Sequence, residues 1–117
     1  MSIEEYFATG PAHERPIFEA VMARVASVGP VHVEPVSVGI FLKRSRTFAE
    51  LRPAQKWVSL SFMLGRTVRH PTIVRKVIAY RGRYWHVANL RVPADLDVDL
   101  GDWLEEAYVE SPDGTGW

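Results

Sequence analysis

The stretch from Pro35 to Leu64, PVSVGIFLKRSRTFAELRPAQKWVSLSFML, decides the fold, because it holds three strand-like runs joined by two short basic turns. Apolar residues alternate with other residues in the first run, Val36–Lys43, and in the third, Trp57–Leu64. The second run, Thr47–Leu51, returns between them, with Phe48 as its expected buried anchor. Alternation with a period of two is typical of strands that bury one face. The stretch therefore predicts an antiparallel sheet with one apolar face and one mixed face.

Extended runs on both sides of this stretch are predicted to enlarge the sheet. Val31–Glu34 comes directly before Pro35, and a proline restricts such a run to an edge strand or a separate small strand. Farther along the chain, Ile73–Tyr80 and Tyr84–Val92 predict a hairpin.

The register of this hairpin stays open, because its connection, Arg81-Gly82-Arg83, fits two turn lengths. A two-residue turn on Gly82-Arg83 would pair Ala79 with His86, whereas a three-residue loop would pair Ile78 with His86. A slip of one residue changes which side chains share a face.

Helices are predicted at both ends of the chain. Ser2 and Glu5 have the spacing of a capping box, which favours a short helix over Ile3–Ala8. Apolar residues at helical spacing predict a longer helix from about Ala12 to Val28, ended by Gly29-Pro30.

The C-terminal helix is predicted to begin at Asp95 or Asp97, because an acidic side chain there caps the free backbone N–H groups. Gly101 weakens this helix by up to about 1 kcal/mol relative to alanine. The tail, residues 111–117, is expected to be frayed. The apolar stripe of the helix consists of Leu96, Leu100, Trp103, Leu104, Ala107 and Tyr108.

Together these elements predict one soluble α+β domain over residues 1–117, with its core at about 10–110. Its mostly antiparallel, five- to six-stranded sheet is packed on one face by the N-terminal and C-terminal helices. A chain of 117 residues, 47% of them hydrophobic, has room for one core but not for two.

The composition excludes several classes of protein. Without cysteine, the chain has no disulfide, thiolate metal site or cysteine nucleophile, which suits a cytoplasmic location. No apolar run approaches the ~18 residues of a membrane span, so no membrane partner is expected. The N-terminal residues are acidic where a signal peptide is basic.

Charge is distributed unevenly along the chain, although the net charge is zero. Residues 41–93 hold twelve Lys and Arg residues against Glu50 alone, a net charge of +11, and the remaining residues carry −11. A basic middle between acidic ends is typical of an anion-binding face. The favoured alternative is that positive strands and negative helices partly neutralise each other in the fold.

No catalytic or metal-binding motif stands out, so an enzyme is the less favoured class and no cofactor is expected. A nucleophile elbow, a P-loop and a dinucleotide fingerprint are all absent. The acidic residues between Asp95 and Asp102 lack the glycine and the distal glutamate of a calcium loop, so helix capping explains them. The four histidines, His13, His32, His70 and His86, show no ligand spacing.

The leading functional hypothesis is a non-enzymatic binding module with a basic, aromatic-flanked sheet face or edge. Basic side chains can contact phosphates, and Trp57 and Trp85 add stacking surface if they lie on the open face. This composition suits a single-stranded nucleic acid or another anion, although the RNA-recognition signature is absent. Basic edge turns also prevent aggregation of sheets without any ligand. The candidate ligand-binding residues are Lys43, Arg44, Arg46, Lys56, Trp85 and His86.

Two further hypotheses compete with this one. The first is a small-molecule pocket or cryptic enzyme with His86 as its polar centre, against which stands the commoner case of a histidine satisfied within a sheet. The second is a protein-association module, for example a homodimer, with Trp57 or Phe41 exposed on a sheet face.

The order of these features resembles DUF5655, a bacterial and archaeal family of domains of unknown function. The resemblance rests on Gly29-Pro30, EPVSVGIFLKRSRTFAELRP, KWVSLSFML and RYWHVANLRVPADLDVDLGDWLEEAY, and covers about residues 10–110. It implies a helix, a strand, a basic turn, further strands including one with a histidine, and a terminal helix.

Residue by residue, Lys43 and Arg46 fall at the basic turn of that family, Phe48 at its aromatic anchor and His86 at its histidine strand. Pro53 falls at its next turn, and Trp103–Tyr108 at its terminal helix. The chain departs from the family at Val36-Ser37-Val38, where Thr-Lys-Thr is common. The resemblance implies no established activity, and the occurrence of such domains in proteins of nucleic-acid processing favours the binding hypothesis only slightly.

Overall fold

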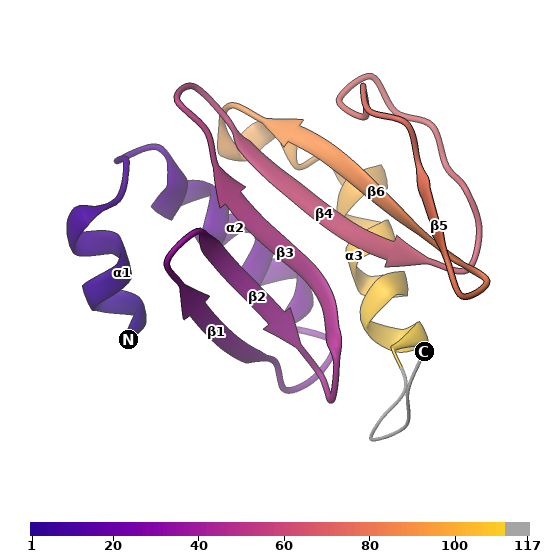
Figure 1. Ribbon diagram of the computed structural model, residues 1–117, viewed down its shortest axis with the longest axis horizontal. Coiled ribbons are helices and arrows are strands. Elements are labelled where there is room, and N and C mark those ends of the chain that lie inside the picture. Colours follow the sequence, from indigo (N-terminus) through magenta and orange to yellow (C-terminus); the bar gives the residue numbers. More distant parts are fainter. Residues whose placement is uncertain (112–117) are drawn as a thin grey trace.

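A six-stranded antiparallel sheet forms the centre of the computed structural model, which describes residues 1–111 (Figure 1). The strands lie in the order β1-β2-β3-β4-β6-β5, so β6 enters the sheet between β4 and β5, the two strands that precede it in the chain. In chain order the elements are α1 (Ile3–Thr9), α2 (Glu14–Val25), β1 (His32–Val36), β2 (Gly39–Lys43), β3 (Thr47–Pro53), β4 (Val58–Leu64), β5 (Ile78–Tyr80), β6 (Arg83–Leu90), a 3₁₀ turn (Pro93–Asp95) and α3 (Val98–Glu110).

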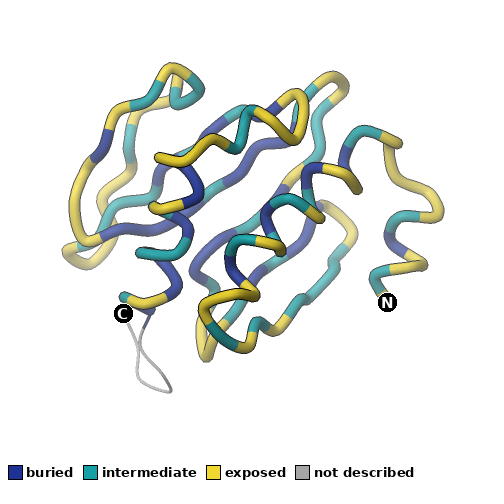
Figure 2. The backbone as a smooth tube through the Cα atoms, turned by 180° about the vertical axis from the view of Figure 1, so that it is seen from behind, coloured by how far each residue is buried: buried dark blue, intermediate teal, exposed yellow. Residues whose placement is uncertain are grey.

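Helices α2 and α3 cover the same face of this sheet, and α1 lies beside them near β1 (Figures 1 and 2). The apolar side chains of the strands meet those of the two helices in one core, in which Phe48, Phe62 and Leu104 have no solvent exposure. The predicted α+β fold, with helices packed on one face of the sheet, is confirmed. Within residues 1–111, no helix combines the length and the apolar character needed to cross a bilayer.

Local sequence signals place the ends of the helices. Ser2 and Glu5 form the expected capping box at the start of α1. Asp97, rather than Asp95, caps α3, because its side chain accepts a hydrogen bond from the N–H of Leu100. The predicted fraying of the tail falls on residues 112–117, which lie outside the described residues; Ser111, just before them, is buried.

The predicted strand Val36–Lys43 is wrong at its beginning. Val36 is the last residue of β1, Ser37 and Val38 form a turn, and β2 begins at Gly39. Val38 lies in this turn and is 55% exposed. It is therefore not part of the buried face of a strand, although its spacing fits the apolar alternation. As predicted, the run before it is an edge strand, and Pro35 lies within it.

Both predicted registers of the second hairpin are wrong. The turn consists of Arg81 and Gly82, whose φ angles are 50° and 77°, as a two-residue hairpin turn with two left-handed positions requires. Ala79 therefore pairs with Tyr84, and Ile78 with Trp85. The shift places Trp85 between Ile78 on β5 and Met63 on β4.

Gly101 allows α2 and α3 to approach each other. The guanidinium of Arg24 crosses α3 at this glycine and bonds to Asp102 (2.7 Å) and Glu105 (2.9 Å). A Cβ at position 101 would overlap that guanidinium.

We expect Gly101→Ala to leave the free energy of unfolding nearly unchanged, because the better helix propensity of alanine, about 1 kcal/mol, is offset by displacement of the Arg24 guanidinium from Asp102 and Glu105. Urea denaturation measures the change. In an Arg24→Ala background the same substitution should instead stabilise the protein, since the overlap is gone. Stabilisation in both backgrounds would contradict this explanation.

Candidate functional site

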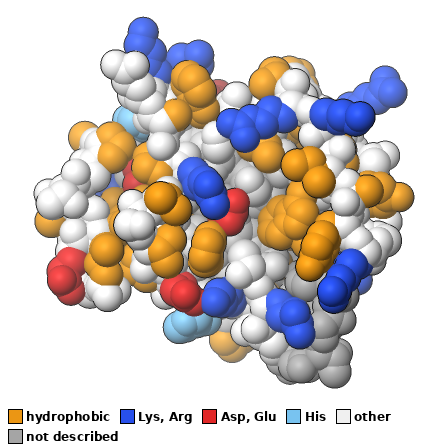
Figure 3. Space-filling view, viewed as in Figure 1, with side chains coloured by type: hydrophobic (Ala, Val, Ile, Leu, Met, Phe, Trp, Pro, Cys, Tyr) orange, Lys and Arg blue, Asp and Glu red, His pale blue; other side chains and the backbone are white. Residues whose placement is uncertain are grey.

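The face of the sheet opposite α2 and α3 is not covered by any described helix (Figure 1). Figure 3 looks onto this open face and shows hydrophobic side chains across it, with Lys and Arg more frequent than acidic residues. Because side chains alternate along each strand, the residues that come before and after each buried residue of a strand point to this face. From the strand registers, the open face includes Phe41, Lys43, Glu50, Arg52, Ser59, Ser61, Met63, Trp85 and Val87.

Two cavities adjoin on the open face, and Trp85 lines both of them. The first has a volume of about 620 Å³ and the second about 720 Å³, each within the range of ligand pockets in proteins. We call them the Glu50 cavity and the Arg46 cavity. The lining of the Glu50 cavity includes Glu50, Arg52, Trp57, Ser61, Arg75 and Trp85. The lining of the Arg46 cavity includes Lys43, Arg46, Thr47, Met63, Tyr80 and Trp85.

The cations of the two cavities differ in how far they are neutralised. Lys43 Nζ lies 2.5 Å from a carboxylate oxygen of Glu34, and Arg52 Nε lies 3.4 Å from one of Glu50. No carboxylate within residues 1–111 pairs with Arg46 or Arg75. These two guanidinium groups are therefore the ones with most of their charge available to a ligand.

Trp57 adds an aromatic wall to the Glu50 cavity. The guanidinium of Arg91 lies 5.7 Å from the centre of its ring, a cation–π distance, and holds the indole in place. Its Nε1–H is buried and has no hydrogen-bond partner among the described residues. An unpaired buried donor is costly, so an acceptor supplied at this point would be stabilising.

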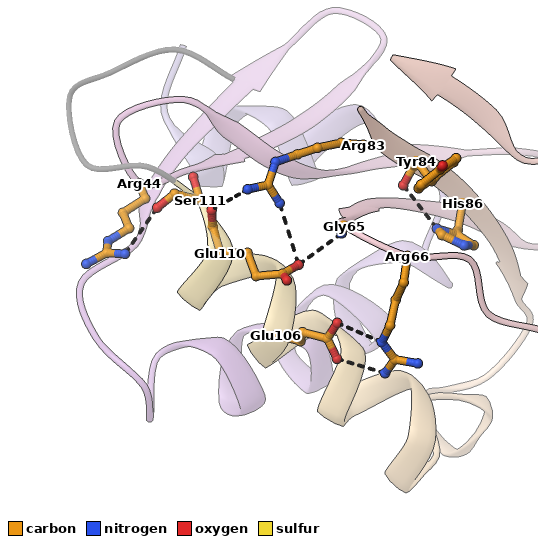
Figure 4. A network of polar contacts seen from close by, with 9 residues as sticks. All are labelled: Arg44, Gly65, Arg66, Arg83, Tyr84, His86, Glu106, Glu110 and Ser111. Atoms are coloured by element: carbon orange, nitrogen blue, oxygen red, sulfur yellow. Dashed lines mark hydrogen bonds and ion pairs between the residues drawn. The ribbon is translucent and has the colours of Figure 1, made fainter. Parts of the chain in front are cut away.

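Three other cations of the basic segment turn toward α3 instead (Figure 4). Arg66 forms two hydrogen bonds with Glu106, of 2.9 and 3.1 Å, and Arg83 lies 3.6 Å from a carboxylate oxygen of Glu110. Arg44 donates to the carbonyl of Ser111 and lies over the ring of Tyr108. Part of the +11 charge is thus neutralised by the acidic C-terminal helix.

His86 lies in the core between the sheet and the helices, with no solvent exposure. Its Nε2 accepts a hydrogen bond from the N–H of Val68 (3.1 Å), which leaves the proton on Nδ1 for the carbonyl of Tyr84 (3.1 Å; Figure 4). The ring stacks on Phe62. Burial lowers the pKa of His86, because a charge there would be desolvated.

The acidic residues before α3 accept hydrogen bonds from backbone N–H groups and from His70. Asp95 accepts from the N–H of Arg91 (2.8 Å), and Asp97 bonds to His70 Nε2 (2.7 Å). His70 Nδ1 also lies 2.7 Å from Thr72 Oγ1, so His70 ties the β4–β5 connection to α3. Within residues 1–111, no group of three or more His, Asp or Glu side chains is placed to hold a metal ion.

The structure therefore brings together only part of the candidate ligand-binding set. Lys43, Arg46 and Trp85 line one cavity on the open face. Lys56 is exposed in the β3–β4 turn and lines neither open-face cavity. Arg44 and His86 contact the helix side, so neither belongs to the candidate site.

Sequence reasoning missed Glu50 and Arg75, two charged residues of the Glu50 cavity. The alternation along β3 contained a signal for Glu50, because it comes directly before Leu51, whose side chain is buried. Arg75 lies in the irregular connection before β5, where no period relates a residue to a face of the sheet.

The model of a family described as "Domain of unknown function (DUF5655)" matches residues 3–111. No curated protein and no solved structure showed significant similarity to the chain.

Proposed function

Since the chain belongs to the DUF5655 family, whose description assigns no activity, we propose its function from the site alone: it is a binding module whose open sheet face takes an anionic ligand. The observation that carries this proposal is the pair of adjoining cavities at Trp85. Their rims contain Arg46 and Arg75, to which no described carboxylate is paired. Such guanidinium groups bind phosphate or carboxylate oxygens through two parallel hydrogen bonds.

A binding role fits the lining of these cavities better than catalysis does. Covalent catalysis needs a nucleophile within hydrogen-bond reach of a base. The described linings of both cavities contain no histidine, and the hydroxyl of Ser59 donates to the amide oxygen of Asn89 instead (3.3 Å). The polar groups of the open face are thus suited to holding a ligand.

Arg46 and Arg44, which lie two positions apart in one turn, provide a matched test. We expect Arg46→Ala to weaken binding of inorganic polyphosphate several-fold at 50 mM salt, and Arg44→Ala to leave the affinity unchanged. Arg44→Ala should instead lower the melting temperature, because its guanidinium bonds to Ser111 and covers Tyr108. Isothermal titration calorimetry and a thermal melt of each variant measure the two effects.

Salt dependence tests the electrostatic basis of the same binding. Contacts to phosphates release counterions, so the affinity of the wild-type chain should fall steeply between 50 and 200 mM salt. Binding that is insensitive to salt, or equal loss of affinity in the Arg44 and Arg46 variants, would contradict an anion site on the open face.

Self-association is the second candidate function, and exposed hydrophobic residues around β5 favour it. Val74, Ile78 and Tyr80 are 71%, 61% and 48% exposed, and β5 is an edge strand of the sheet. A homodimer joined at this edge would cover them. Light scattering that reports a monomer at high protein concentration would count against it.

A further inference from the structure

We infer that the anionic ligand is a single-stranded nucleic acid, of which one nucleotide lies across Trp85, with its phosphate in the Arg46 cavity and its base in the Glu50 cavity. This inference rests on the proposed function and specifies its ligand. Three features carry it: the different charged groups in the linings of the two cavities, the aromatic side chain that they share, and the polar floor of the Glu50 cavity.

The charges assign each half of a nucleotide to one cavity. The lining of the Arg46 cavity contains two cations, Lys43 and Arg46, and no carboxylate. Thr47 and Tyr80, which also line that cavity, have hydroxyl groups that can donate hydrogen bonds to phosphate oxygens. The other cavity contains Glu50 together with Arg52 and Arg75, so it presents an acceptor beside its donors, which suits a base better than a phosphate.

Trp85 is the surface on which a base can stack. It lies in the middle of β6, with Met63 and Ile78 as its neighbours across the sheet, and it is only partly buried. Both cavities open onto its side chain. A base placed against the indole gains stacking energy whatever its sequence, as is usual for proteins that bind single strands.

The floor of the Glu50 cavity selects among the bases. Glu50 and Ser61 are paired on neighbouring strands, and Ser59 lies two residues along β4 on the same face. An ionised carboxylate only accepts hydrogen bonds, so Glu50 favours a base with an exocyclic amino group. Cytosine and adenine present such a group, whereas thymine presents a carbonyl oxygen in the same place.

The ligand must be unpaired, because a base can lie flat against Trp85 only when it is not stacked inside a duplex. Arg75, on the rim of the Glu50 cavity, is then placed to contact the next phosphate of the strand. The structure thus fits a short segment of a single strand better than a duplex, in which the faces of the bases are stacked on one another.

Fluorescence anisotropy with 12-nucleotide homopolymers of deoxycytidine and deoxythymidine tests the inference at 50 mM salt. We expect the wild-type chain to bind the cytidine strand at least fivefold more tightly. Trp85→Leu should weaken binding of both strands about tenfold, and Trp85→Phe, which keeps an aromatic ring, should weaken it less. Glu50→Gln should reduce the preference for cytidine to less than twofold, since an amide both donates and accepts.

A pair of double variants with equal net charge separates the phosphate contacts from general electrostatics. Arg46→Ala/Arg75→Ala should lower the slope of log affinity against log salt by about 1.4, because each phosphate that is no longer neutralised accounts for about 0.7. Arg15→Ala/Lys56→Ala removes the same charge outside both open-face cavities and should leave the slope nearly unchanged. Circular dichroism confirms that each variant is folded.

Two outcomes overturn the inference, and they are distinguishable from failure of the proposed function. If polyphosphate or an acidic peptide such as polyglutamate binds as tightly as the cytidine strand, and Trp85→Leu has no effect, the site binds anions but not nucleic acid. Equal affinity for the two strands in the wild-type chain removes the assignment of the base to the Glu50 cavity. Failure of every polyanion to bind would remove the proposed function itself.

Discussion

Replacing His86 by alanine is expected to lower the free energy of unfolding by about 3–5 kcal/mol. The imidazole has no solvent exposure, stacks on Phe62 and accepts the hydrogen bond of the Val68 N–H, so its removal creates a cavity and leaves a buried donor unpaired. Urea denaturation at pH 7.5 measures the loss. His32→Ala, a change of the same kind at an exposed position of β1, is the matched control and should cost less than about 0.5 kcal/mol.

The same residue predicts a pH dependence with a definite sign. Burial lowers the pKa of His86 in the folded chain below its ordinary value of 6.5. Below about pH 6.5 the unfolded chain therefore binds a proton that the folded chain does not, and stability falls as the pH drops toward the lower, folded pKa. The slope in this window is at most about 1.4 kcal/mol per pH unit.

His86→Ala removes this contribution, whereas His32→Ala keeps it. The difference in unfolding free energy between wild type and His86→Ala should therefore shrink from pH 7.5 to pH 5. A difference that stays constant, or grows, over that range would show that His86 is charged in the folded chain, contrary to its burial.

The sheet and its helices could be predicted because they rest on local patterns. Alternation in β4 and the stripe of α3 each repeat often enough that a single wrong residue does not matter. The hairpin of β5 and β6 rests on one turn, and its sequence, Arg81-Gly82-Arg83, allows the glycine to take different places in that turn. A shift of one or two residues there decides which residue of β5 lies opposite Trp85.

The candidate site depended on which face of the sheet the helices leave open, and no local pattern contains that fact. Lys43 and Arg46 belong to a basic turn and line a cavity, but Arg44 in the same turn reaches α3. His86 has basic neighbours in the chain, yet its side chain lies on the covered face of the sheet. Residues that are close in sequence can lie on opposite faces of the sheet, because the side-chain direction reverses from each residue of a strand to the next.

The sequence does not indicate that Glu14 is buried, because an acidic residue in the first turn of a helix is usually exposed and interacts favourably with the helix dipole. In the structure its side chain is fully buried. One oxygen, Oε2, accepts a hydrogen bond from the hydroxyl of Tyr6 on α1 (2.9 Å), and the other, Oε1, has no partner among the described residues. Burial raises the pKa of Glu14, and the bond from Tyr6 opposes that rise.

Tyr6→Phe is therefore expected to destabilise the chain by about 1–3 kcal/mol at pH 8, and by less at pH 4. The pKa of Glu14 is higher in the folded chain than in the unfolded chain. The stability that the protonated carboxyl group contributes below about pH 4.5 is therefore lost as the pH rises through the pKa of the folded chain. Removing the tyrosine hydroxyl raises that pKa further, so more stability is lost by pH 8. Urea denaturation at the two pH values measures the effect.

The double variant Tyr6→Phe/Glu14→Met decides whether the carboxyl group is the cause. Replacing both partners by apolar groups of similar size leaves no buried polar atom unpaired, so the double variant should be more stable at pH 8 than Tyr6→Phe alone. It should also lose the extra dependence on pH. Glu19→Gln, on the exposed face of the same helix, changes a carboxylate that is 64% exposed and should show neither effect. If the double variant were less stable than Tyr6→Phe at both pH values, Glu14 would be contributing favourable packing or unseen hydrogen bonds that outweigh its burial.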